Sequence, residues 1–444
     1  MAGDIGINER AIILPEAGAA EHGSALLSLE QTHGRSMHHY GPRVVIAEVP
    51  EREEEADSLS PFEFTGDGKA DLPTAPAGVD AVGQLGLAAF GLRQSSALAA
   101  AKAKRPHAEE DWDAKGATPP CTAEAQTEVG EMGLAEALSG SSTSSRLTGS
   151  VAVGIIIVEG PTAKLKFSAA ERTKVIAEVQ NGLGWLGSKS GPGGISWVYD
   201  IRIITLSVSP SSNDTTLAQK ENRWRNPAMA QLGYPAGMAG VQQYVNNLRL
   251  SKKTNWAYCA YFTKYPLGHF AYASIGGPRM VMAYDNDGWG PDNIDRVFAH
   301  ETGHIFGAPD EYKASNCNCG GQWGHYERPN TNCEACAPGG GVACIMKGNS
   351  WEMCEHTPFH LGFVQERKYS GVFRQGAGGH AVWADASWTK FQQKWSEFSG
   401  QGLRLRDLKI AGTGSAARYS GVFQQGTGGY GLWVNATWTS FLQK

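Results

Sequence analysis

Clear hydrophobic patterns appear in the middle of the chain, beginning at residue 151. Residues 151–158 (VAVGIIIV) form a continuous apolar run, which is typical of a strand buried on both faces. A helix is predicted over residues 169–186, because Ser168 and Glu171 have the spacing of a capping box. Residues 197–208 predict a second strand. A strand, a helix and a strand in this order predict a parallel pair.

The pattern continues through residue 305. Residues 222–250 are predicted to be mostly helical, with an interruption between Gly233 and Pro235, and two strands are predicted at residues 256–262 and 279–284. A further helix follows, with an apolar face made by Ile294, Val297, Phe298 and Ile305. These elements predict a mixed α and β domain over residues 151–366.

Residues 1–110 predict a small α+β N-terminal domain. Two strands, residues 37–40 and 43–49, flank a Gly-Pro turn. This strand pair weakly resembles that of the subtilisin-type propeptide fold, which implies a propeptide-like role, while an accessory domain without inhibitory function is the preferred interpretation. Residues 111–150 are rich in Ala, Gly, Ser and Thr and predict a flexible linker.

The last part of the chain contains a tandem repeat. Residues 369–394 align with residues 419–444 at a period of 50, with 16 of 26 positions identical, and the second unit is truncated. We expect residues 367–444 to form β-rich modules with aromatic cores. The repeats resemble Trp-rich bacterial tandem repeats attached to secreted hydrolases, and contact with glycans or a cell surface is the alternative use of Trp383, Trp388, Trp395, Trp433 and Trp438.

Composition removes several classes of function. The net charge is −5 and no long basic run occurs, so no nucleic-acid partner is expected. The longest apolar run has eight residues, too short to span a membrane. The chain starts without a secretory signal, yet six of its eight cysteines lie within 38 residues. We therefore expect an extracellular or cell-surface protein whose export route the sequence does not show.

The main chemical signal is the stretch HETGHIFGAPD, residues 300–310. His300 and His304 are four apart, so on a helix both imidazoles reach one ion, with Glu301 beside it. Gly307 allows the chain to turn so that Asp310 can return as a third ligand. Three ligands leave one position open for water, as in catalytic Zn²⁺ sites, and Glu301 then acts as general base in hydrolysis.

This stretch resembles the HExxHxxGxxD variant of the metzincin clan of zinc endopeptidases. The segment Cys344-Ile345-Met346 is similar to the clan's Met-turn, which implies that Met346 is a packing floor beneath the metal and not a ligand. The resemblance implies an α/β-type sandwich and an extended protein or peptide substrate bound along an edge strand at residues 274–284. An Asp ligand in place of a third His should make the bound water less acidic.

Several alternatives stay open at this stage. Glu311, His325 and Glu327 compete with Asp310 as third ligand. The enzyme could instead be a zinc hydrolase specialised for cell-wall or other non-protein peptide substrates. A third hypothesis is a non-catalytic surface-binding protein that keeps the fold, although the intact HExxH residues argue against it.

The clustered cysteines have two interpretations. Three disulfides would pin the Gly-rich loop between Gly307 and Met346, and this is preferred, since a cysteine abuts the Met-turn in several extracellular metzincins. A four-thiolate structural zinc site is the alternative. The cysteines concerned are Cys317, Cys319, Cys333, Cys336, Cys344 and Cys354. Upstream, Cys121 either pairs with Cys259 or blocks the zinc as a propeptide thiolate.

A calcium site at Asp285-Asn-Asp287-Gly288 is a weaker hypothesis. The glycine is at position four of the loop, whereas the EF-hand rule requires position six. A solvated acidic turn is the preferred interpretation.

Overall fold

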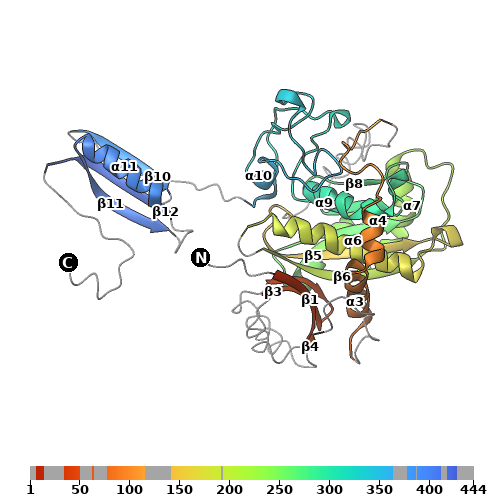
Figure 1. The fold of residues 1–444 in the computed structure, drawn as a ribbon. Helices are drawn as coiled ribbons and strands as arrows, with labels where there is room; N and C mark the ends of the chain where they lie inside the picture. The colour runs from red at the N-terminus through yellow and green to blue at the C-terminus, as the bar shows by residue number, and fades with distance from the viewer. Residues whose placement is uncertain are drawn as a thin grey trace. The chain divides into compact units, whose positions relative to one another are not determined.

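The computed structural model divides the chain into two compact units, residues 1–366 and 367–444 (Figure 1). The structure describes residues 7–14, 35–50, 63–64, 78–115, 142–191, 194–363, 378–386, 388–411 and 418–427. Each unit is described by itself.

The first unit contains one large sheet and most of the helices. Its strands are β1 (Ile7–Ile13), β2 (Arg35–Tyr40), β3 (Val44–Pro50), β4 (Glu63–Phe64), β5 (Gly149–Glu159), β6 (Ile195–Thr205), β7 (Trp256–Thr263), β8 (Ala271–Ala273) and β9 (Arg279–Ala283). Its α-helices are α3 (Ala81–Arg93), α4 (Ser96–Lys102), α6 (Ala169–Ser188), α7 (Leu217–Gln231), α8 (Met238–Lys252), α9 (Ile294–Ile305) and α10 (Thr357–Leu361).

The nine strands follow the order β4-β1-β3-β2-β6-β5-β7-β9-β8. The five central strands, β2, β6, β5, β7 and β9, run parallel to their neighbours within this group. Antiparallel strands flank them: β3 pairs with β2 on one side and β8 pairs with β9 on the other. The mixed α and β architecture expected from the sequence is confirmed.

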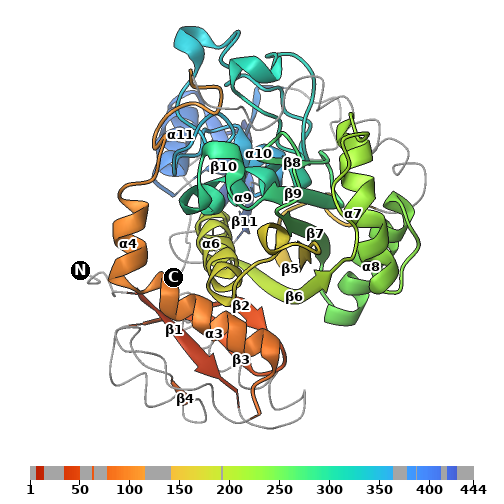
Figure 2. The same ribbon diagram turned by 90° about the vertical axis from the view of Figure 1, so that its right-hand side faces the viewer.

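Helices lie on both faces of this sheet (Figure 2), and a hydrophobic core is formed on each face. Strand β5 contributes to both cores, with Val153 and Ile155 on one face and Ala152 and Ile156 on the other. This alternation explains the continuous apolar run, because a strand covered on both sides has no solvent-facing positions. Helices α3, α6 and α9 pack in the first core, and α7 and α8 pack in the second.

The central elements agree with the sequence predictions. Ser168 caps α6, and its side chain and that of Glu171 form the expected capping box. The predicted interruption between two helices falls between α7 and α8. The predicted parallel pairing of β5 and β6 is confirmed. Among the described residues, no helix has the length and apolar character needed to cross a membrane.

The N-terminal strands differ from the separate domain expected for residues 1–110. The hairpin of β2 and β3 forms as predicted, but β2 also pairs in parallel with β6, with His38 opposite Trp197. One sheet therefore runs through both regions. The boundary expected at residue 110 was based on composition, which carries no information about pairing between distant strands. Of the residues assigned to the linker, 111–115 and 142–150 are described, and Trp112 and Leu147 are fully buried.

The edge strand expected at residues 274–284 is corrected by the sheet order. Strand β9 lies between β7 and β8, so it is an interior strand. The edge at this side of the described sheet is β8, which has only three residues. The reason is a tight reversal between β8 and β9, through Gly276 and Gly277, both with positive φ.

The second unit is a three-stranded antiparallel sheet with one helix. Its strands are ordered β10-β12-β11, and its elements are β10 (His380–Ala386), α11 (Trp388–Gly400), β11 (Leu403–Ala411) and β12 (Arg418–Gln425). Phe391, Tyr419 and Phe423 form its core, with Trp383 and Trp395 packed against them. These two tryptophans therefore have a structural role. Most of the second predicted repeat, including Trp433 and Trp438, lies outside the described residues.

Candidate metal centre

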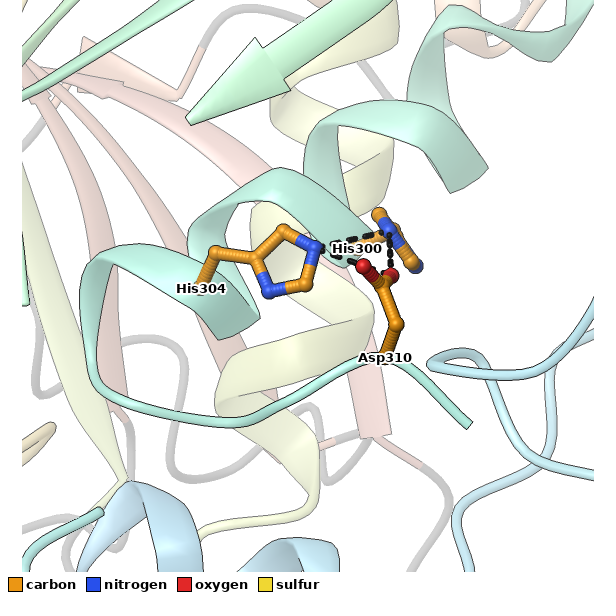
Figure 3. A group of neighbouring side chains, drawn as sticks. All are labelled: His300, His304 and Asp310. Carbon is orange, nitrogen blue, oxygen red and sulfur yellow. Dashed lines mark hydrogen bonds and ion pairs between the residues drawn. The ribbon is translucent and has the colours of Figure 1, made fainter. Parts of the chain in front are cut away.

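The helix predicted to bind metal is α9, and all of its residues are buried. Val297 and Phe298 fix it against the sheet in the first hydrophobic core. His300 and His304, one turn apart, project from the same side of the helix, and Figure 3 shows both imidazoles beside the Asp310 carboxylate. The four-residue spacing therefore places both imidazoles on the same side of the helix, as predicted.

A glycine turn brings the third residue to the histidines. Helix α9 ends at Ile305, and Gly307 follows with a φ of +92°, a conformation that side-chain-bearing residues rarely adopt. The chain then reverses, and the backbone carbonyl of Asp310 accepts a 2.7 Å hydrogen bond from the Asn330 side chain. This contact holds the loop so that the Asp310 carboxylate faces the helix.

The three side chains converge on one point. The Nε2 atoms of His300 and His304 are 3.0 Å apart, and Asp310 Oδ1 lies 3.1 Å from each of them. The other ring nitrogens donate to backbone carbonyls: Nδ1 of His300 to Ile345 at 2.9 Å, and Nδ1 of His304 to Ala308 at 2.8 Å. With Nδ1 carrying the proton, each Nε2 presents a lone pair to the centre, as a metal ligand must.

The charges of the three groups are strongly coupled. Burial lowers the pKa of His304, but the Asp310 carboxylate outweighs this effect and raises it to about 9. Burial raises the pKa of Asp310, yet the two histidines hold it well below its usual range. An ionised carboxylate among buried acceptors favours a positive charge at the centre of the cluster.

Glu301 lies beside this cluster on the same helix. Burial raises its pKa to about 7, with His304 and His300 opposing the rise and Asp310 adding to it. Its Oε2 atom is buried and has no hydrogen-bond partner among the described residues. A buried carboxylate oxygen without a donor is costly, so it is typical of a group that meets water or substrate.

Met346 lies directly against the helix that carries the histidines. It is fully buried, and a Cβ atom on Gly303 would come within 2.6 Å of the Met346 sulfur. The backbone carbonyl of Met346 accepts a 2.9 Å hydrogen bond from the Glu311 N–H. Met346 therefore packs against α9 while its backbone holds the loop that carries Asp310.

The other candidates for third ligand lie elsewhere. His325 and Glu327 are exposed and are not among the groups of ligand-type residues that gather in the described part of the chain. Glu311 points into a second buried cluster with Cys344 and Cys354, whose ligand-type atoms lie within 4.8 Å of one another. Burial raises the pKa of Glu311 to about 8, and Cys354 adds to the rise.

The clustered cysteines form two disulfides, Cys317–Cys333 and Cys319–Cys336. They cross-link the loop between Gly307 and Met346, as the disulfide hypothesis predicted. These four sulfurs lie in two pairs at disulfide distance, which favours the disulfide interpretation over a four-thiolate zinc site. The expected third bridge is not formed: Cys344 and Cys354 are buried thiols that both contact Thr357 Oγ1 at 3.3 Å.

Two other hypotheses concern Cys121 and the acidic turn at residues 285–288. Cys121 lies outside the described residues, so neither its pairing with Cys259 nor its action on the metal is tested. Residues 286–288 form a short 3-10 turn in which the Asp285 side chain accepts from the Asp287 N–H at 3.3 Å. This is the local turn expected of a solvated acidic loop.

Sequence reasoning missed the groups that orient the ligands. The carbonyls of Ile345 and Ala308 hold the two imidazoles, and backbone atoms leave no signal in residue type. Trp112 was also missed; its ring lies edge-on to His300 with centroids 5.4 Å apart. The available signal was a large aromatic residue between Asp111 and Asp113, in a stretch otherwise interpreted as a linker.

Comparisons with known proteins give little information about the function of this chain. No protein-family model matches the chain, and no curated protein matches it. Among solved structures, metalloproteinase-II from Bacteroides fragilis is similar over 55% of this chain and 62% of that chain, with 10% sequence identity and a TM-score of 0.24. An overlap this partial does not establish a shared fold or activity.

Proposed function

We propose that this chain is a zinc-dependent endopeptidase of the metzincin kind, with His300, His304 and Asp310 as metal ligands and Glu301 as general base. The observation that carries the proposal is the convergence of three acceptor atoms on one buried point, with both Nδ1 protons already committed to backbone carbonyls. With His304 neutral, such a set of acceptors is stabilised by a cation at the centre; without one, the Asp310 carboxylate favours a proton on His304 instead.

The distances suit zinc. Zn–N bonds of about 2.0–2.1 Å in a tetrahedral arrangement separate two ligand atoms by about 3.3 Å. The observed separations of 3.0, 3.1 and 3.1 Å are close to this value. Three neutral or anionic N and O ligands with one open position are typical of catalytic rather than structural zinc.

The residues of this chain then have distinct tasks. When bound, zinc supplies a Lewis acid that polarises a carbonyl and increases the acidity of water. Glu301, raised toward neutral pKa by burial, takes the proton of the attacking water and passes it to the leaving amine. The carbonyls of Ile345 and Ala308 keep each imidazole in the tautomer that leaves Nε2 available.

The surroundings of the site support a proposal for the substrate and the compartment. We propose that an extended protein or peptide segment pairs along β8, the edge strand beside α9, because a sheet edge offers unpaired backbone groups to a peptide. The two disulfides favour an oxidising, extracellular setting. The β-rich second unit would hold the enzyme on a surface or glycan.

The test compares the full chain with Glu301→Gln, which preserves the shape of the side chain and removes the base. We expect one zinc per chain in both proteins by elemental analysis. Hydrolysis of casein should fall by roughly 10²- to 10⁴-fold in the variant, the contribution typical of a general base. Glu171→Gln, a change at the first turn of α6, is the matched control and should retain activity.

The outcomes separate the hypotheses. Zinc in the wild type with cleavage only of cell-wall peptides would favour the specialised hydrolase. Zinc without hydrolysis of casein, cell-wall peptides or a peptide library would favour the non-catalytic binding protein. A wild-type chain that binds no zinc would overturn the proposal.

A further inference from the structure

A segment far upstream of the metal ligands is built into the metal centre. Residues 105–115, here called the strap, follow helix α4 and run antiparallel to the residues just after Met346, with Asp111 opposite Gly348. Three backbone hydrogen bonds join the two segments: Glu109 N–H to the Asn349 carbonyl at 2.9 Å, Asn349 N–H to the Glu110 carbonyl at 2.8 Å, and Trp112 N–H to the Lys347 carbonyl at 3.0 Å.

Ion pairs attach the strap to the metal-binding helix. Arg105 pairs with Asp295 at 3.1 Å, and Glu109 pairs with Arg296 at 2.8 Å, both in the first turn of α9. The strap also approaches the Met346 turn very closely. A Cβ on Gly348 would lie 2.8 Å from the Glu110 carbonyl oxygen, so a larger residue there would displace the strap backbone.

The strap delivers one fully buried side chain to the site. The indole N–H of Trp112 donates to the carbonyl of Ile345 at 2.8 Å. This carbonyl also accepts from Nδ1 of His300 at 2.9 Å. Trp112 also places its ring edge-on to the His300 imidazole, and it packs against Trp289 and Phe270 on its other side.

We propose that Trp112 is a positioning residue for the metal centre, acting on the ligand His300 through their shared acceptor, the Ile345 carbonyl. The inference rests on the proposed zinc site. A carbonyl oxygen has two lone pairs, and two donors fix its direction more tightly than one. The ring contact restricts rotation of the imidazole in the same place. Together they hold the His300 Nε2 lone pair toward the point where the ligands converge.

The strap is therefore part of the enzyme and not a linker to it. If Trp112 only filled space in the core, removing its N–H while keeping an aromatic ring would affect stability alone. If it positions His300, the same change also alters the affinity and the geometry of the metal site. These two effects can be measured separately.

The experiment uses the full-length chain, Trp112→Phe, and Trp224→Phe as control. Trp224 is equally buried but lies in the core on the other face of the sheet, and its indole N–H has no hydrogen-bond partner among the described residues. Zinc affinity is measured by competition with a chromogenic chelator. The d–d absorption spectrum of the Co²⁺-substituted proteins reports the geometry of the ligands.

We expect Trp112→Phe to weaken zinc binding by roughly three- to tenfold, less than the 10- to 100-fold typical of a direct partner of a ligand. Its cobalt spectrum at saturating metal should be shifted from that of the wild type. Trp224→Phe should change the affinity less than about twofold and leave the spectrum unchanged.

Two results distinguish the failure of this inference from the failure of the proposed function. A wild type without zinc overturns the proposed function. A wild type that binds zinc, with Trp112→Phe equal to Trp224→Phe in both affinity and spectrum, overturns only the positioning role. If Trp112→Phe does not fold, β-(3-benzothienyl)alanine at position 112 keeps the bicyclic shape without the N–H and is subject to the same criteria.

Discussion

This protein has two buried clusters of residues that commonly bind metals, and Asp310 of one cluster directly precedes Glu311 of the other in the sequence. His300, His304 and Asp310 form one, and Glu311, Cys344 and Cys354 form the other. In the second cluster, both carboxyl oxygens of Glu311 accept hydrogen bonds. The Cys354 thiol donates to Glu311 Oε1 at 3.1 Å, and the Asn332 side chain donates to Glu311 Oε2 at 2.7 Å.

The first cluster balances its acceptors only through a positive charge at its centre, which is a proton on His304 when no metal is bound. Its Nδ1 protons point outward to the carbonyls of Ile345 and Ala308, so the two Nε2 atoms and Asp310 Oδ1 face each other. Buried polar groups need partners, and a set of acceptors alone needs a cation. The two clusters are alike in residue type and proximity; the direction of the imidazole Nδ1 protons distinguishes them.

The largest expected effect separates the adjacent carboxylates Asp310 and Glu311. Asp310→Asn removes one of three ligands and should weaken zinc binding by about 10²- to 10³-fold, since structural sites with four ligands gain roughly 2.5–4 kcal/mol per ligand. Glu311→Gln should keep one zinc per chain. It should change the free energy of unfolding at neutral pH by less than about 1.5 kcal/mol, because the raised pKa of Glu311 keeps its carboxyl protonated there and the amide resembles that neutral form.

Elemental analysis after dialysis, together with urea denaturation, measures both effects. Retention of zinc by the Asp310 variant and loss by the Glu311 variant would reverse the assignment of the two clusters.

A third prediction concerns His360, a buried histidine outside both clusters. Its pKa is lowered, whereas that of His304 is raised. Burial lowers the pKa of His360 to about 4, so it stays neutral in the folded state while the unfolded chain takes up a proton below pH 6.5. Stability is therefore lost as the pH falls from 6.5 toward 4, by about 2 kcal/mol at pH 5. His360→Gln keeps a donor near the Arg328 carbonyl, which His360 Nε2 approaches at 3.2 Å, and should reduce this loss.

The measurement is urea denaturation of both proteins at pH 7.5 and pH 5. Loss of zinc at low pH contributes equally to both, so it cancels in the difference between them. Identical pH dependence in the two proteins would show that His360 is not the group responsible.

The smallest expected effect concerns Met346. Met346→Leu conserves volume and should cost less than about 1.5 kcal/mol of stability. Zinc affinity should change by less than about threefold, because the sulfur packs against Gly303 of α9. A loss above 100-fold in the chelator competition would indicate that the thioether takes part in binding.

Local signals in the sequence predicted the elements that depend on neighbours along the chain. The capping box at Ser168, the apolar run of β5 and the spacing of His300 and His304 are of this kind. Pairing across long separations was not predictable: neither the contact of β2 with β6 nor the interior position of β9 leaves a mark in composition. Trp112 was missed for the same reason, since a single aromatic residue has no period.

Disulfide pairing also depends on contacts that the local sequence does not predict, as Cys344 and Cys354 show. Their density in sequence predicted a bridge, whereas in the structure the two thiols share Thr357 Oγ1 as a hydrogen-bond partner. Which cysteines combine depends on the path of the loop, and this path is set by contacts such as that of Asn330 with the Asp310 carbonyl.

The hydrogen bond from Trp112 to Ile345 joins residues 233 positions apart. Long-range contacts of this kind form late, because closing a long loop costs entropy before the contact is made. During synthesis, the strap can form its hydrogen bonds to residues 345–349 only after this segment has left the ribosome. A nascent chain therefore contains His300 before it contains the Ile345 carbonyl that holds this imidazole.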